Sequence, residues 1–192
     1  MKPVCKPVPQ PPSRRSYALR RGRVSIPGAR YFITLVTANR ESGLTPRAVA
    51  NDLLNTCRAQ HRERDYALLM ATVMPDHLHL LFTLGERLSL SQVIAKFKSS
   101  SPLGSEGPGL HWQDNFYDHR LRQDAALEPF ARYIFLNPYR AELLRSRDTW
   151  PWFVRNHHYQ PEFWEGLSDG QYPPLEWMRT AESLQAIIEA DE

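Results

Sequence analysis

Cysteine is scarce in this sequence and long hydrophobic runs are absent. The 192 residues include two cysteines, Cys5 in a proline-rich stretch and Cys57 in a helical pattern. They form neither a disulfide framework nor a CxxC metal pair, so we expect a reducing compartment, the cytoplasm. No apolar stretch approaches the roughly 20 residues that span a bilayer, and the N-terminal residues lack the apolar run of a signal peptide. These absences argue against a disulfide scaffold and against a membrane role.

Acidic residues are missing before Glu41, whereas residues 156–192 carry far more acidic than basic side chains. Such asymmetry favours a polyanionic partner for the N-terminal region. Arginine also exceeds lysine, and its planar guanidinium matches phosphate in a bidentate manner. Arginine-rich codon usage is an alternative explanation for that excess. The arginines of this region that are predicted to bind a polyanion are Arg14, Arg15, Arg20, Arg21 and Arg23.

Composition divides the chain into three parts. Residues 1–28 place a run of prolines ahead of the arginine cluster, which predicts a flexible basic arm. Residues 29–155 are predicted to form one folded domain, since a chain of this length is too short for two full-sized ones. Residues 156–192 are predicted to be an acidic C-terminal accessory tail.

Hydrophobic patterning and turn residues predict alternating strands and helices. Strands are expected at 31–37, 66–73 and 77–83, with a further strand or extended segment at 112–121. Helices are expected to begin at Pro46 with Thr45 as N-cap, after the N-cap Ser89, and at Asp124. This order is typical of an α+β fold with a ferredoxin-like, RRM-like antiparallel sheet flanked by helices.

Two histidines stand two positions apart in one predicted strand. Side chains alternate along a strand, so His77 and His79 share one face while Leu78, Leu80 and Phe82 share the other. Two imidazoles at this spacing can converge on one divalent ion and leave positions for a third ligand and a substrate oxygen. A structural or surface histidine pair is the alternative for this pattern.

A tyrosine and an asparagine share a face of the last predicted helix. Tyr133 and Asn137 are one helical turn apart and lie on the same face as Phe130 and Ile134, the face expected to meet the sheet. Pro138 predicts that the helix kinks or ends at Asn137. The alternative is a core-packing tyrosine followed by an asparagine that caps the next turn.

Several motifs in order resemble those of REP-associated tyrosine transposases, which are single-tyrosine transposases of the HUH type. They span roughly residues 28–155. The matching segments are Tyr-Phe-Ile-Thr (31–34), Met-Pro-Asp-His-Leu-His (74–79), Lys-Ser (98–99), Trp-Gln (112–113), Phe-Tyr-Asp-His (116–119), Tyr-Ile (133–134), Asn-Pro (137–138) and Trp-Pro (150–151).

The resemblance implies an HUH endonuclease fold in residues 29–155 and a role for each candidate residue. It implies that His77 and His79 are paired metal ligands, that Asn137 is the third ligand and that Tyr133 is the nucleophile. The implied reaction is nicking and strand transfer of single-stranded DNA through a 5′-phosphotyrosine intermediate. Mg²⁺ or Mn²⁺ is the implied cofactor, and the donor types do not choose between them. No GxxxxGK[ST] phosphate loop is present, in agreement with a reaction that needs no ATP.

The implied substrate is a short palindrome folded as a DNA hairpin with a single-stranded flank. Whether the protein acts as a monomer or a homodimer stays open. His119 either orients the site or packs beside the sheet, and we favour packing. Besides the arginines of the arm, the predicted DNA-binding residues are Lys96, Lys98, Arg120, Arg122 and Arg140.

Two segments depart from the family pattern, one at the end of the predicted catalytic helix and one before it. Asn137-Pro138-Tyr139 stands where the family usually reads Asn-Pro-Val, and Phe-Tyr-Asp-His (116–119) replaces Phe-Trp-Glu-His.

A rival interpretation is a non-catalytic, single-stranded nucleic-acid-binding module, because a ferredoxin-like sheet with basic loops also suits that role. That interpretation gives Tyr133 and the histidine pair no task.

Overall fold

The computed structural model describes residues 24–103, 109–124, 126–145, 147–169 and 172–191. The predicted arginines of the arm, Arg14, Arg15, Arg20, Arg21 and Arg23, lie outside these residues. Within the described ranges, no helix is both long enough and apolar enough to cross a bilayer.

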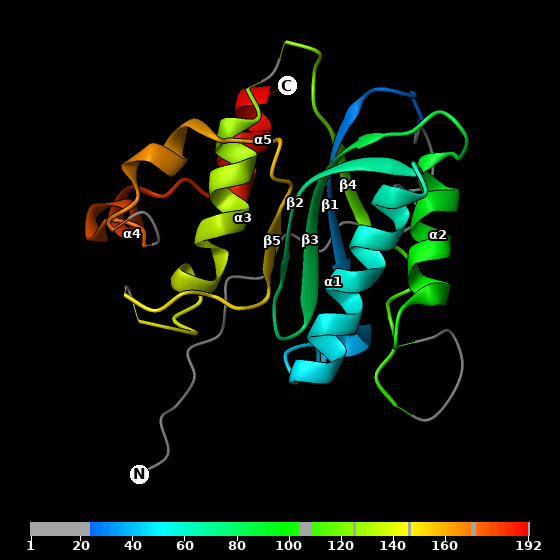
Figure 1. Ribbon diagram of the computed structural model, residues 1–192, viewed down its shortest axis with the longest axis horizontal. Coiled ribbons are helices and arrows are strands. Elements are labelled where there is room, and N and C mark those ends of the chain that lie inside the picture. The colour runs from blue at the N-terminus through cyan, green and yellow to red at the C-terminus, as the bar shows by residue number, and fades with distance from the viewer. Residues whose placement is uncertain (1–23, 104–108, 125, 146, 170–171, 192) are drawn as a thin grey trace.

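A five-stranded antiparallel sheet forms the centre of the protein (Figure 1). Its strands are β1 (Arg30–Val36), β2 (Tyr66–Val73), β3 (His77–Leu84), β4 (Tyr117–Arg120) and β5 (Phe153–Arg155). They lie side by side in the order β4-β1-β3-β2-β5, with every neighbouring pair antiparallel. The first four strands have the ferredoxin-like order, and the predicted α+β fold is confirmed.

Helices cover both faces of this sheet, as Figure 1 shows. On one side lie α1 (Arg47–Arg62) and α2 (Leu90–Ser100). On the other lie α3 (Glu128–Arg140), α4 (Leu175–Thr180) and α5 (Leu184–Asp191). Short 3-10 helices span Ala38–Arg40 and Glu162–Gly166. The sheet therefore separates two layers of helices.

Alternation along β3 assigns its side chains to two separate hydrophobic cores. Leu78, Leu80 and Phe82 are buried in the core under α1 and α2, whereas Leu81 is buried in the core under α3. Burying a side chain of this size contributes roughly 1.5–3 kcal/mol. A one-residue slip of the strand would exchange the two sets, so burial fixes which face carries His77 and His79.

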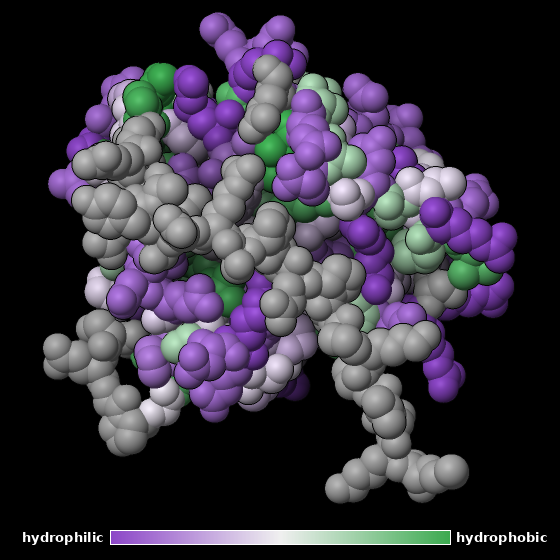
Figure 2. Space-filling view, turned by 180° about the vertical axis from the view of Figure 1, so that it is seen from behind, coloured by the Kyte–Doolittle hydropathy of each residue, from purple (hydrophilic) through white to green (hydrophobic). Residues whose placement is uncertain are grey.

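The C-terminal residues form part of the second core. Phe163, Leu167, Ile187 and Ile188 are buried in the same cluster as Phe130 on α3. The acidic side chains of residues 156–192 are thus interspersed with apolar ones that pack on the domain. Seen from behind, the described surface is largely polar, and hydrophobic side chains appear only in small groups (Figure 2).

Two predicted helix starts need correction. α3 begins at Glu128 rather than at Asp124, and its second residue is Pro129. A helix that started at Asp124 would place Pro129 in its interior, where the ring clashes with the carbonyl four residues earlier. α1 begins at Arg47 with Pro46 at the N-cap, one residue later than predicted. The capping box of Ser89 with Gln92 is confirmed.

The helix of Tyr133 does not end at Asn137. α3 continues through Pro138 to Arg140, and the Ala141 N–H donates to the Asn137 carbonyl at 3.0 Å. Pro138 sits in the last turn, so the missing N–H costs a single helical hydrogen bond near the end of the helix. Asn137 therefore keeps its helical position relative to Tyr133.

Candidate active site

The two histidines of β3 converge on the face that α3 covers. Their Nε2 atoms lie 3.1 Å apart and their ring centres 4.6 Å apart. His79 is 3% exposed, whereas the side chain of His77 is 15% exposed. His79 therefore lies at the floor of the site and His77 at its rim.

Each imidazole is held through its other nitrogen. A carboxylate oxygen of Asp76 lies 2.5 Å from His77 Nδ1, and the Thr34 hydroxyl lies 2.9 Å from His79 Nδ1. A carboxylate only accepts, so His77 Nδ1 carries a proton. In the neutral form of such an imidazole, Nε2 presents a lone pair. Such contacts are typical of metal-binding histidines, whose second nitrogen is usually bonded to a carboxylate, carbonyl or water.

Asn137 reaches the same point from α3. Its amide nitrogen lies 3.0 Å from His79 Nε2, and the residue is 9% exposed. The oxygen and nitrogen of an amide have nearly the same shape, so a half-turn of the side chain places the oxygen where the nitrogen now lies. Asn137 can therefore offer either a donor or a ligand oxygen to this site.

Tyr133 completes the group, one helical turn before Asn137. Its ring centre lies 5.4 Å from that of His79, with the two planes at 70°. The ring centres of Phe32 and Tyr133 lie 6.0 Å apart in an edge-to-face arrangement, and the Arg140 guanidinium carbon lies 5.6 Å from the Tyr133 ring centre. The predicted convergence of His77, His79 and Tyr133 on one side of the sheet is observed.

Burial shifts the pKa values of His79 and Tyr133. It lowers the pKa of His79 well below 6.5, and the nearby charges of His77 and Arg40 act in the same direction. Burial also raises the pKa of Tyr133 above 10, although Arg140, a hydrogen bond from Asn137 and Arg40 oppose it. At neutral pH His79 is therefore a neutral potential ligand, and Tyr133 is a phenol that must lose its proton to attack.

The donor set fits a divalent ion. Ligand atoms in adjacent positions of an octahedral ion with bonds near 2.1 Å lie about 3 Å apart, close to the spacing of the two Nε2 atoms. Imidazole nitrogens with one amide oxygen suit several divalent metals. Among the residues that the structure describes, no three His, Cys, Asp or Glu side chains cluster in a way that could hold a metal. Asn137, whose amide lies 3.0 Å from His79 Nε2, is the candidate for a third protein ligand.

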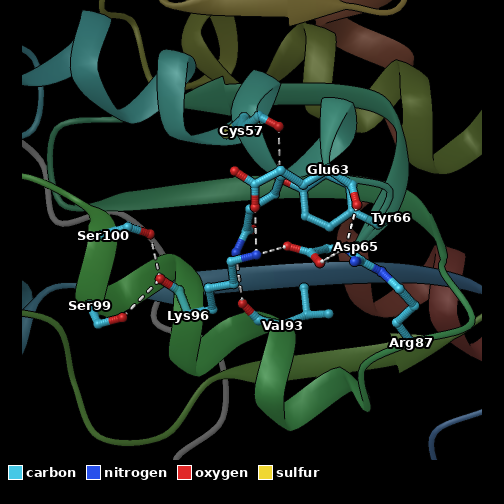
Figure 3. Close-up of polar contacts among 10 residues, drawn as sticks. Cys57, Glu63, Asp65, Tyr66, Arg87, Val93, Lys96, Ser99 and Ser100 are labelled. Atoms are coloured by element: carbon cyan, nitrogen blue, oxygen red, sulfur yellow. Dashed lines mark hydrogen bonds and ion pairs between the residues drawn. The ribbon is translucent and has the colours of Figure 1, made fainter.

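The predicted DNA-binding lysines lie on α2, the layer across the sheet from Tyr133. The Lys96 ammonium contacts carboxylates of Asp65 at 2.5 Å and Glu63 at 2.6 Å, as Figure 3 shows. Lys98 donates to the carbonyls of residues 113, 114 and 115. Both ammonium groups thus hold the protein's own loops together, and a role in DNA binding stays a prediction for each.

Of the predicted basic residues on the α3 side, Arg140 is the one beside Tyr133. Its guanidinium also donates to the Glu182 carbonyl at 2.9 Å. Arg120 is exposed on β4, and Arg122 lies 3.7 Å from a carboxylate oxygen of Asp191. The structure thus brings Arg140 to the site.

His119 packs beside the sheet, as favoured from the sequence. Its ring is stacked on Phe130 at 5.4 Å, and its Nε2 lies 2.6 Å from a carboxylate oxygen of Asp191. The contact joins β4 to α5. His119 therefore helps to hold the C-terminal helix on the domain.

Sequence reasoning missed three groups that support the site. Asp76 and Thr34 hold the histidines, and Arg40 holds Asp76 with 3.0 Å between the guanidinium and the carboxylate. Asp76 could have been found from its position next to His77. Thr34 and Arg40 could not, because their contacts depend on the pairing of β1 with β3 and on the loop after β1.

Comparison with known proteins finds relatives among transposases. The profile of the family described as "Transposase IS200 like" matches residues 25–135. The REP-associated tyrosine transposase of Escherichia coli is 24% identical over 157 residues, which are 81% of this chain and 88% of that protein. A Haemophilus influenzae protein provisionally given the same name is also 24% identical, over 74% of this chain and 90% of the relative.

The fold has a counterpart among solved structures. A REP-associated tyrosine transposase bound to a REP hairpin superposes with a TM-score of 0.61 at 23% identity, covering 79% of this chain and 89% of that one. At this identity the superposition establishes the shared fold. The match of the family profile covers more than half of the chain, so the protein belongs to the IS200-like transposase family, as its resemblance to REP-associated tyrosine transposases predicted.

Proposed function

We propose that this protein nicks single-stranded DNA at Tyr133 and transfers the bound strand to another 3′-hydroxyl. The observation that carries the proposal is the convergence of Tyr133, Asn137 and the two histidines on one face of the sheet. Membership of a transposase family supports this kind of chemistry. A binding module would not need a phenol placed beside a pair of oriented imidazoles.

The proposed covalent step exchanges one phosphate ester for another. The Tyr133 oxygen forms a bond to phosphorus as the bond from phosphorus to the 3′-oxygen breaks, which leaves a 5′-phosphotyrosine and a free 3′-hydroxyl. The phenolic proton is lost to solvent and the departing 3′-oxygen takes one up. In the reverse direction, a different 3′-hydroxyl attacks the phosphotyrosine and releases Tyr133. The ester bond is conserved, so no nucleotide cofactor is consumed.

The chain's own residues prepare this step. The edge-to-face contacts of Phe32 and His79 with Tyr133 fix the ring, so the phenolic oxygen is held in place before the substrate arrives. The Asn137 side chain and the Arg140 charge near the ring both favour the phenolate. These contacts counteract part of the effect of burial on the Tyr133 pKa.

We also propose that His77, His79 and Asn137 hold Mg²⁺ or Mn²⁺. A divalent ion held there would supply positive charge to the scissile phosphate and offset the charge that develops on its oxygens. The oriented Nε2 atoms and the neutral state of His79 support this role.

The proposed substrate is a DNA hairpin with a single-stranded flank. A similar fold occurs in a REP-associated tyrosine transposase bound to a REP hairpin, and the E. coli relative covers most of this chain. The excess of basic residues before Glu41 suits a polyanion.

A covalent-adduct assay tests the proposal. With a divalent ion and a labelled single-stranded hairpin, the wild-type protein should form a protein–DNA adduct that survives denaturation, and Tyr133→Phe should form none. The variant removes only the phenolic oxygen, so folding and DNA affinity should change little. Tyr139→Phe is a matched control on the same helix, because the Tyr139 hydroxyl donates to the Asp148 carbonyl away from the histidines.

An adduct with Tyr133→Phe would contradict the assignment of the nucleophile and direct attention to Tyr117 or Tyr139. No adduct with the wild type on any hairpin, together with retained DNA binding, would support the non-catalytic binding module instead.

A further inference from the structure

The loop that follows β1 is fastened to the turn between β2 and β3, next to His77. The Thr37 N–H donates to the Asp76 carbonyl at 2.9 Å, and the Thr37 hydroxyl lies 3.0 Å from the same oxygen. The N–H groups of Gly43 and Leu44 donate to the Pro75 carbonyl at 2.8 and 3.0 Å. Both segments lie at the same end of the sheet (Figure 1). Main-chain atoms thus hold these two segments together.

The side chain of Asp76 is therefore not needed for the turn itself. Its carboxylate instead bridges His77 and Arg40. One oxygen lies 2.5 Å from His77 Nδ1 and the other 3.0 Å from the Arg40 guanidinium. The Asp76 side chain is 20% exposed and that of Arg40 is 38% exposed. The contacts thus run from the exposed Arg40 through Asp76 to His77.

Arg40 is presented by an unusual backbone. Asn39 has φ 53° and Arg40 has φ 55°, both in the left-handed region. Residues other than glycine, and to a lesser degree asparagine and aspartate, adopt this region at an energetic cost. An arginine at such a position is strained, and strain of this kind is retained where the surrounding structure or a function requires it.

We infer that Arg40 and Asp76 are positioning residues that fix His77 with its Nε2 directed toward His79 and Asn137. Arg40 locks the Asp76 carboxylate through one oxygen, and the other oxygen holds His77 as the Nδ1–H tautomer with a defined ring orientation. This inference rests on the proposed function for its purpose, a pre-oriented ligand for a divalent ion. Its geometry can be tested without any DNA reaction.

The structure offers a variant that separates positioning from folding. Arg40→Gly relieves the backbone strain at φ 55° and removes the guanidinium, so the melting temperature should stay the same or rise while the hold on Asp76 is lost. Arg64→Gly is the matched control, since the exposed Arg64 has φ 61° in the turn after α1. Asp76→Ala tests the next link in the chain and leaves the main-chain bonds of the turn in place.

Two readouts on the full chain decide the matter. Long-range ¹H–¹⁵N spectra of the imidazoles should show a pure Nδ1–H tautomer of His77 in the wild type and in Arg64→Gly. They should show a mixture of tautomers in Arg40→Gly and Asp76→Ala. Titration with Mn²⁺ should give an affinity about 10- to 100-fold weaker for the latter two variants, the usual loss on removing such supporting contacts. Arg40→Lys should recover part of that affinity.

The inference is overturned if Arg40→Gly and Asp76→Ala keep the wild-type tautomer and the wild-type Mn²⁺ affinity, or if wild-type His77 is not the Nδ1–H tautomer. A different result would contradict the proposed function. If the tautomers behave as expected but the wild type forms no adduct with DNA, the positioning stands and the nicking reaction does not.

Discussion

His77 and His79 face each other across 3.1 Å through their Nε2 atoms, while their Nδ1 atoms are held by Asp76 and Thr34. When both Nδ1 atoms act as donors, the lone pairs of the two Nε2 atoms are directed at one point. Two lone pairs that face each other in a buried site repel, unless a proton or a cation lies between the nitrogens. The pair is therefore suited to binding a cation.

Divalent ions should stabilise the protein through this pair. At 100 times the dissociation constant, Mn²⁺ should add about 2.7 kcal/mol to the free energy of unfolding, a rise in Tm on the order of 5–10 °C. His77→Gln should abolish most of the rise, and the same replacement at the exposed His157 should leave it in place. Thermal unfolding with and without Mn²⁺ measures both. An equal rise in His77→Gln would place the ion elsewhere.

Acidification should destabilise the fold through His79. Burial lowers its pKa in the folded protein well below 6.5, so below about pH 6.5 the unfolded chain takes up a proton that the folded state does not. Stability from this group is complete above pH 6.5 and is lost as the pH falls toward the folded pKa. The slope contributed is at most about 1.4 kcal/mol per pH unit.

Urea unfolding between about pH 7.5 and pH 5 measures that slope. His79→Gln should reduce it by more than His157→Gln, in which an exposed imidazole is replaced in the same way. A slope unchanged by His79→Gln would show that this imidazole is not held neutral.

Gly85→Ala should be strongly destabilising. A Cβ at this position would lie 2.3 Å from the Arg64 carbonyl oxygen and 2.7 Å from that of Asp65, and neither main-chain atom can move cheaply. We expect a loss on the order of 3 kcal/mol. Gly43→Ala is the control, because the nearest atom there is the end of the flexible Leu110 side chain. Denaturant midpoints of the two variants give the comparison, and equal values would contradict the expectation.

Removal of the residues before Gly28 should weaken DNA binding without unfolding the domain. The positive charges before Gly28 are expected to neutralise phosphates and release counterions, so the difference in affinity between full-length and shortened protein should be large at low salt and shrink as salt rises. Binding isotherms at several salt concentrations measure this. Equal affinities at low salt would show that the arm does not contribute to DNA binding.

Much of the fold could be predicted from local patterns. Period-two alternation placed Leu78, Leu80 and Phe82 opposite the two histidines, and their burial under α1 and α2 confirms it. Elements without a strong local pattern were missed. β5 has only three residues, and α4 and α5 lie in a segment whose acidic composition hid the apolar side chains that pack on α3.

The sequence by itself determined which residues share a face: His77 with His79 through the repeat of a strand, and Tyr133 with Asn137 through the turn of a helix. Such periodicities extend over a few residues, so they can be seen without a structure. Only the tertiary structure decided that these two faces meet, because that depends on which side of the sheet α3 packs. It also decided the supporting contacts of Thr34 and Arg40, which lie 45 and 36 positions from their partners. It likewise turned Lys96 toward Asp65, since the nearest available carboxylate is set by how α1, α2 and β2 come together in space.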